Sequence, residues 1–141
     1  MNTTHRFRRL AVTGLVATIA AMAATALVAA CAQAMGADFK VTDGDETVPV
    51  SGIAFVTGVF SVVGVGIAAA LLHWSDHPAA RFVQTTVALT AVSLAPPFLA
   101  PADGATTGSL VAIHLVAAAV MIPALARSLR GLVVSDPLLA G

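Results

Sequence analysis

Four long stretches of this chain contain no Asp, Glu, Lys or Arg, and their length constrains the fold more than any other feature. The stretches are residues 10–37, 48–72, 82–102 and 104–126. About 20 apolar residues in an α-helix, rising about 1.5 Å each, cross a hydrocarbon core about 30 Å thick. The sequence therefore predicts a single membrane domain over residues 1–141, with four spans at approximately 10–36, 49–73, 80–99 and 105–127.

The composition excludes a water-exposed globule. Only 10% of the 141 residues are charged and 58% are hydrophobic, whereas a soluble domain carries about 25% charged residues. The formal net charge is zero, and the sequence contains no basic run that would suggest nucleic-acid binding. The predicted partner is therefore the lipid bilayer, and no nucleic acid is expected.

The charged residues between the stretches sort by sign, which predicts an orientation. Arginines precede the first stretch and follow the fourth, and Arg81 closes the second connection. The first connection has one cation, Lys40, beside four acidic residues, and the third has only Asp103. Because positive flanks resist translocation, both termini are predicted to be cytoplasmic. The expected fold is an all-α, antiparallel up-down four-helix bundle in the plasma or inner cell membrane.

The first stretch also fits two other interpretations. An arginine-rich start followed by apolar residues describes a signal peptide, and residues 32–34 match the small-x-small pattern of a cleavage site. Residues 28–31 resemble a bacterial lipobox, which would make Cys31 a lipidated N-terminus. The apolar stretch is longer than the roughly 7–15 residues of a signal peptide, so a retained helix is predicted. A lipoprotein processed at Cys31 and a cleaved signal remain alternatives.

Small residues recur at steps of four and three along the predicted helices. In membranes such residues let helices approach closely, so they predict intramolecular contact faces. The predicted faces consist of Gly14, Thr18, Ala21, Thr25 and Val28 on the first span, Ala54, Gly58, Ser61, Val65 and Ala68 on the second, and Thr86, Thr90 and Ser93 on the third. In addition, Pro96 and Pro97 are predicted to stop or kink the third helix near its outer end.

His114 is the only ionisable residue well inside a predicted span. Residues at the same expected depth suggest a polar layer of His114, Ser61 and Ser93, with Thr90 or Thr25 added. An ionisable group inside a membrane is a functional hypothesis by default, and imidazole can carry protons near neutral pH. The alternative is a neutral histidine that donates one hydrogen bond to a neighbouring hydroxyl or carbonyl group.

No motif in the chain indicates a reaction. There is no Ser/His/Asp arrangement and no Cys-x-x-Cys pair, and His73 and His77 are too few for a zinc site, which needs three or four ligands. We therefore expect no catalytic residues, no cofactor, no metal and no enzymatic activity. The leading hypothesis is a small structural or accessory membrane protein that contacts a second copy or another membrane protein. The alternative is a transporter or proton-handling protein that uses His114.

Two segments resemble a known family. Residues 82–96, FVQTTVALTAVSLAP, and residues 114–127, HLVAAAVMIPALAR, resemble the third and fourth spans of a family of small actinobacterial membrane proteins of unknown function. The resemblance implies four helices and a retained first helix, and it implies no activity. It places His114, Pro123 and Arg127 within the recognisable pattern, which adds Arg127 to the candidate functional residues.

Overall fold

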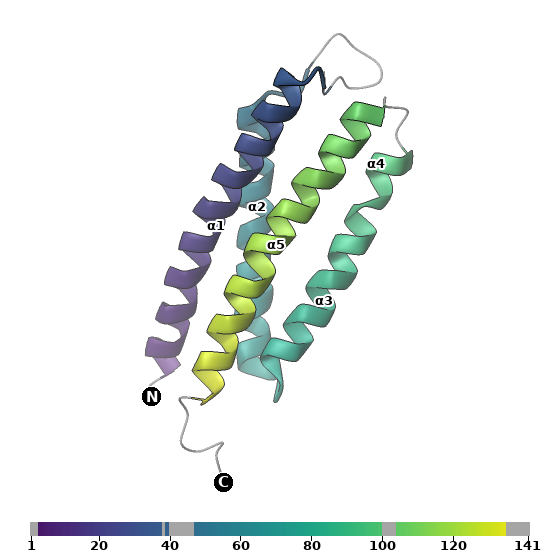
Figure 1. Ribbon diagram of the computed structural model, residues 1–141. Helices are drawn as coiled ribbons and strands as arrows, with labels where there is room; N and C mark the ends of the chain where they lie inside the picture. Colours follow the sequence, from purple (N-terminus) through teal and green to yellow (C-terminus); the bar gives the residue numbers. More distant parts are fainter. Residues whose placement is uncertain (1–2, 38, 40–46, 100–103, 135–141) are drawn as a thin grey trace.

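The computed structural model describes residues 3–37, 39, 47–99 and 104–134, and in this part of the chain it contains five helices (Figure 1). They are α1 (Thr3–Ala34), α2 (Val50–Trp74), α3 (Pro78–Ser93), α4 (Ala95–Leu99) and α5 (Gly104–Val134). The long helices alternate in direction, so the start of α1 and the end of α5 lie at the same end of the molecule (Figure 1).

Three of these helices are long and apolar enough to cross a membrane. They are α1, α2 and α5, with 32, 25 and 31 residues. α1 and α5 are longer than their predicted spans, because α1 begins at Thr3 and α5 continues to Val134. The extra turns carry arginines, whose long side chains can reach polar surroundings while the backbone keeps its helical hydrogen bonds.

The third predicted span is divided, as its prolines predict. α3 ends at Ser93, and the N–H of Leu94 still donates to the carbonyl of Thr90 at 3.1 Å. In a continuous helix Pro96 and Pro97 would face the next two carbonyls, but proline has no N–H to donate. In α4 both prolines fall in the first turn, where N–H groups have no partner within the helix.

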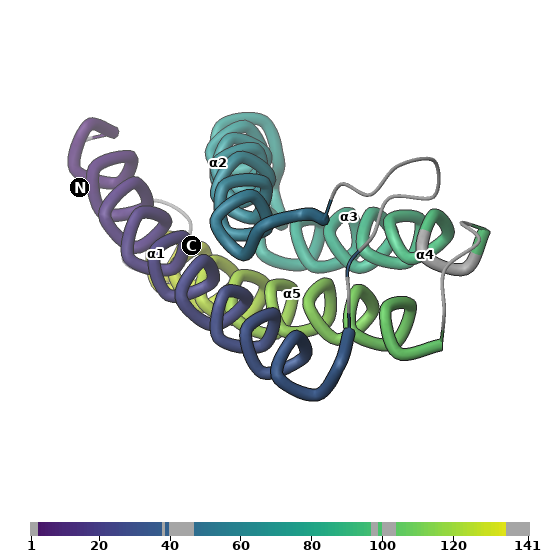
Figure 2. The backbone as a smooth tube through the Cα atoms, turned by 90° about the horizontal axis from the view of Figure 1, so that it is seen from above, coloured from purple at the N-terminus to yellow at the C-terminus, as the bar shows by residue number. Residues whose placement is uncertain are grey.

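α2 and α5 separate α1 from α3. α1 packs most extensively against α5 and α2, whereas α3 makes smaller interfaces with α5 and α2 and none with α1 among the described residues (Figure 2). α1 is therefore an integral part of the bundle, and α3 is its least tightly packed long helix.

The predicted contact faces of α1 and α2 are confirmed in large part. Gly14, Thr18, Ala21 and Thr25 are buried on α1, and Gly58, Ser61 and Ala68 are buried on α2. The close approach depends on glycine: a Cβ added to Gly14 would lie 2.6 Å from Val65 Cγ2, and one added to Gly58 would lie 2.9 Å from Met22 Sδ. The hydroxyl oxygens of Thr25 and Thr57 lie 3.2 Å apart and link the two helices.

The core is complete at one end of the bundle only. At the end where α1 begins, a buried cluster draws on all four long helices, and α3 contributes Phe82, which is 1% exposed. The cluster at the opposite end is formed around Ala29, Phe39 and Ile113, with no residue from α3 or α4. Pro78 and Phe82 are the buried residues of α3. Beyond Phe82 the helix no longer completes the core.

Candidate functional site

A cavity of about 630 Å³ lies where α3 leaves the core, between α2, α3 and α5. It is partly open to the outside of the bundle. Its walls are mostly apolar side chains, and the polar side chains that line it are Thr57, Ser61, Thr86, Thr90, Ser93 and His114. Three of the four long helices therefore meet around an apolar space that contains a small number of polar groups.

The inner face of α3 explains why this space stays open. Thr86, Thr90 and Ser93 line the cavity, and each is too small to reach across to α2 or α5. These three residues were predicted to form a close contact face. They are instead half-buried, because the helix diverges after Phe82. The prediction of a tightly packed face on the third span is therefore wrong.

The hydroxyl groups of α3 are already used as donors. Thr86 donates to the carbonyl of Phe82 at 2.7 Å, Thr90 to that of Thr86 at 2.8 Å, and Ser93 to that of Thr90 at 2.8 Å. Each hydroxyl oxygen can still accept a hydrogen bond. The α3 wall of the cavity therefore offers acceptors and has no donor left over.

His114 projects from α5 into the lining of the same cavity and is half-buried. Its Nδ1 lies 2.8 Å from the carbonyl oxygen of Leu110. A carbonyl can only accept, so Nδ1 must be the protonated nitrogen, and in a neutral ring Nε2 is then an acceptor. This matches the predicted alternative in which one N–H donates to a nearby carbonyl. It leaves Nε2 without a hydrogen bond to any residue in the described part of the chain.

The predicted polar layer is assembled in part. His114, Ser61, Ser93 and Thr90 all line the cavity, although they come from three helices. Thr25 does not belong to this group, because its hydroxyl lies between α1 and α2 and bonds the carbonyl of Ala21 at 2.9 Å. The sequence located the polar residues by depth, but it gave no sign of the empty volume between them.

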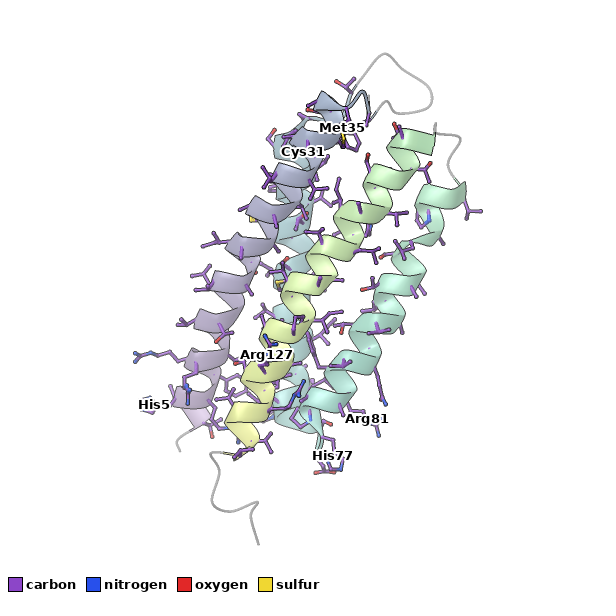
Figure 3. All side chains as sticks on the ribbon, in the orientation of Figure 1. His5, Cys31, Met35, His77, Arg81 and Arg127 are labelled. Carbon is purple, nitrogen blue, oxygen red and sulfur yellow. The ribbon has the colours of Figure 1, made fainter. Side chains whose placement is uncertain are left out.

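The other candidate residues lie elsewhere (Figure 3). Arg127 is exposed on the last part of α5, and Cys31 is exposed near the end of α1. The His73 ring lies beside Phe7, with ring centroids 6.4 Å apart. Within the described residues no three His, Cys, Asp or Glu side chains are grouped so that they could hold a metal ion. The acidic first connection, residues 40–46, and Asp103 lie outside the described residues.

These observations define a small α-helical membrane protein: long apolar helices, an apolar cavity between them and few ionisable groups. The chain belongs to the family of unknown function DUF6069, whose model matches residues 5–131. The match includes nearly all of α1, and it agrees with the predicted resemblance to an uncharacterised family. Comparison with curated proteins and with solved structures gives no match.

Proposed function

We propose that this protein is a non-enzymatic, four-span accessory protein of the cell membrane that holds an apolar, membrane-soluble ligand between α2, α3 and α5. The observation that carries the proposal is the cavity of about 630 Å³ beside His114. Ligand sites are typically concave, mostly apolar and about 300–1,000 Å³ in volume, with a few polar groups that fix orientation.

The interrupted third rod is long enough to be the fourth span. The 16 residues of α3, Leu94 and the five residues of α4 make a run of 22, about 33 Å long at about 1.5 Å per residue. Hydrocarbon cores are about 30 Å thick. With the arginines of α1 and α5 at one end of the molecule, the positive-inside rule assigns that end to the cytoplasm.

The polar groups of the cavity favour a ligand with one hydroxyl group. Nε2 of His114 is an acceptor without a partner among the described residues, and it is surrounded by apolar walls. A lipophilic alcohol would donate its O–H to this nitrogen and leave its hydrocarbon body against the valines, leucines and isoleucines of the walls. A hydrogen bond in such surroundings is protected from competition with water.

Proton handling by His114 is a second proposal, supported by the position of the ring on the cavity wall. It is weaker than ligand binding for a physical reason. A proton path needs waters or further titratable groups, and His114 is the sole ionisable residue in a lining that is otherwise apolar or hydroxyl-bearing. An apolar lining favours hydrocarbon over a chain of water molecules.

A photo-crosslinking experiment tests ligand binding. The full-length protein in phosphatidylcholine nanodiscs is labelled with a long-chain alcohol that bears a diazirine, and the sites are mapped by mass spectrometry. We expect labelling concentrated on the cavity lining, for example at Ile67 and Ala117. The methyl ether of the same probe keeps the chain but loses the O–H donor, so it should label these sites about threefold to tenfold less, the effect of one neutral hydrogen bond.

Two glycines of α2 supply a matched pair of variants. A side chain added at Gly64 or at Gly66 meets no atom within 4 Å, but only Gly64 lines the cavity. Gly64→Leu should fill the space and abolish the focused labelling, whereas Gly66→Leu should leave it unchanged. His114→Phe should remove the difference between the alcohol and its ether. Equal labelling of all outward helix faces, or equal effects of the two leucine variants, would overturn the proposal.

A further inference from the structure

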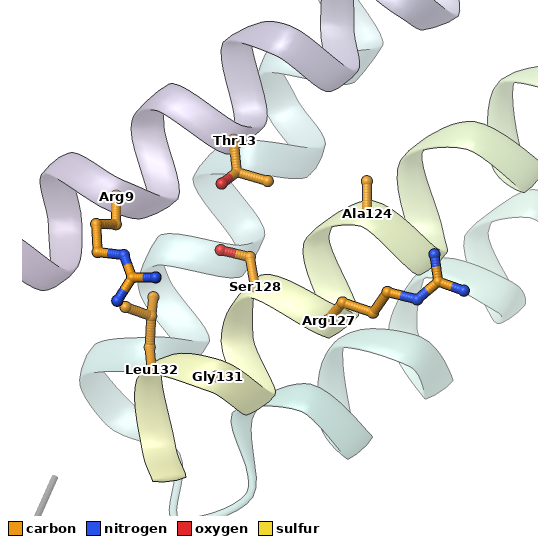
Figure 4. Close-up of a pocket in the computed structure, with 7 residues that line it drawn as sticks. All are labelled: Arg9, Thr13, Ala124, Arg127, Ser128, Gly131 and Leu132. Atoms are coloured by element: carbon orange, nitrogen blue, oxygen red, sulfur yellow. The ribbon is translucent and has the colours of Figure 1, made fainter. Parts of the chain in front are cut away.

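A second cavity, of about 310 Å³, lies between α1 and α5 at the end of the bundle where α1 begins. Its lining includes two arginines and two hydroxyl side chains, from both helices: Arg9, Thr13, Arg127 and Ser128. Figure 4 shows the hydroxyls of Thr13 and Ser128 facing each other across the gap. The Arg9 guanidinium group extends toward Leu132, whereas that of Arg127 points away from Arg9 (Figure 4).

The polar groups of this cavity have unused hydrogen-bonding capacity. None of these four side chains forms a hydrogen bond or ion pair with another residue in the described part of the chain. Thr18, one turn beyond Thr13, differs in this respect because its hydroxyl bonds the carbonyl of Gly14 at 2.8 Å. A guanidinium group and two hydroxyls around one gap are donors, and donors of this kind suit an anion with several oxygens.

The electrostatic surroundings also favour an anion. Six arginines lie at this end of the bundle within the described residues, and Asp76 is the one carboxylate side chain in that part of the chain. Such an excess of positive charge raises the local concentration of anions. A phosphate group that entered the cavity would therefore meet an attractive potential as well as hydrogen-bond donors.

The depth of the cavity identifies the source of the phosphate. Arg9 stands directly before the first uncharged stretch, and Arg127 stands directly after the last. In a membrane both arginines would therefore lie at the boundary between hydrocarbon and headgroups, where lipid phosphates are found and where basic pockets between helices bind headgroups. The apolar side chains of Ala124 and Leu132 complete the lining and would contact the start of an acyl chain.

We propose that this cavity binds the phosphate group of an anionic phospholipid. Arg9, Thr13 and Ser128 donate hydrogen bonds to the phosphate oxygens, and Arg127 adds positive charge at the rim. The proposal requires only that the helices cross a membrane, so it does not depend on the ligand proposed beside His114.

Native mass spectrometry of the full-length protein tests this site, with phosphatidylglycerol titrated in detergent. Arg9→Gln should lower the affinity at least about tenfold, because a hydrogen bond between charged groups is lost. Arg81→Gln is the matched control: it removes the same charge from an exposed arginine at the same end that does not line the cavity. It should change the affinity less than about twofold, as expected for a screened surface charge.

Further arms make the result decisive. Ser128→Ala and Thr13→Val keep the net charge and should each lower affinity about threefold, the effect of one neutral hydrogen bond; they carry the test if Arg9→Gln fails to fold. Diacylglycerol, which has no phosphate, should bind without dependence on Arg9. Equal losses in Arg9→Gln and Arg81→Gln would overturn the proposal in favour of a diffuse charge effect. Inorganic phosphate binding as tightly as the lipid would overturn the lipid assignment.

Discussion

Replacement of Gly14 by alanine should separate α1 from α2. An added Cβ would lie 2.6 Å from Cγ2, 2.9 Å from Cγ1 and 3.4 Å from Cβ of Val65. Rotation of the valine cannot relieve this overlap, because all three side-chain carbons surround the added atom. The two helices would have to move apart, which would disrupt the packing along the whole α1–α2 interface, including the contact between Gly58 and Met22.

The expected magnitude follows from the overlap and from a matched control. Overpacking a close contact costs about 1–3 kcal/mol, while a change from glycine to alanine in a helix favours folding by up to about 1 kcal/mol. Gly66→Ala isolates the second effect, since a Cβ there meets no atom within 4 Å. We therefore expect the free energy of unfolding of Gly14→Ala to be about 1–3 kcal/mol lower than that of Gly66→Ala.

Unfolding in mixed detergent micelles, followed by far-ultraviolet circular dichroism, measures these differences. Val65→Ala removes both Cγ atoms, so the double variant Gly14→Ala/Val65→Ala should recover stability, with a coupling energy of about 1–2 kcal/mol between the two positions. Equal stabilities of Gly14→Ala and Gly66→Ala, or a double variant whose loss is the sum of the single losses, would refute the close approach of the helices.

Three further predictions concern the same helices and their orientation. Thr25→Val should lower the free energy of unfolding by about 0.6 kcal/mol, the average for a hydrogen bond between membrane helices, relative to Thr18→Val, which alters a hydroxyl bonded only within its own helix; equal losses would contradict the link to Thr57. Phosphatase and fluorescent-protein fusions should report His77 and the C-terminus as cytoplasmic, and an external C-terminus would contradict the four-span arrangement. The intact mass of the purified protein should include α1, whereas a diacylated product that begins at Cys31 would establish the lipoprotein alternative.

The sequence predicted helix positions and the α1–α2 interface because both depend on local patterns. Uncharged length determines where a helix can cross a bilayer, and small residues such as Gly14 and Gly58 mark where two helices can approach closely. The break after Ser93 was predictable for the same reason, since the missing N–H groups of Pro96 and Pro97 act within one turn.

The two cavities were not predictable from local patterns. Thr86, Thr90 and Ser93 have the spacing of a contact face, and only the divergence of α3 after Phe82 turns that face into a cavity wall. Arg9 and Ser128 are more than a hundred positions apart in the sequence. They meet because α1 and α5 form the most extensive interface of the bundle, and no periodicity within either helix indicates that pairing.

The gap beside α3 is a consequence of folding in lipid. In water, burial of the exposed valines and leucines would drive α3 onto α2 and α5, at about 25 cal/mol for each Å² removed from water. In a bilayer lipid tails are as apolar as these side chains, so helices associate through close packing instead. Phe82 supplies such packing at one end of α3, and small residues offer little along the rest. The distance between α3 and α2 should therefore depend on whatever apolar molecule occupies the cavity, which makes this helix the part of the bundle most responsive to a ligand.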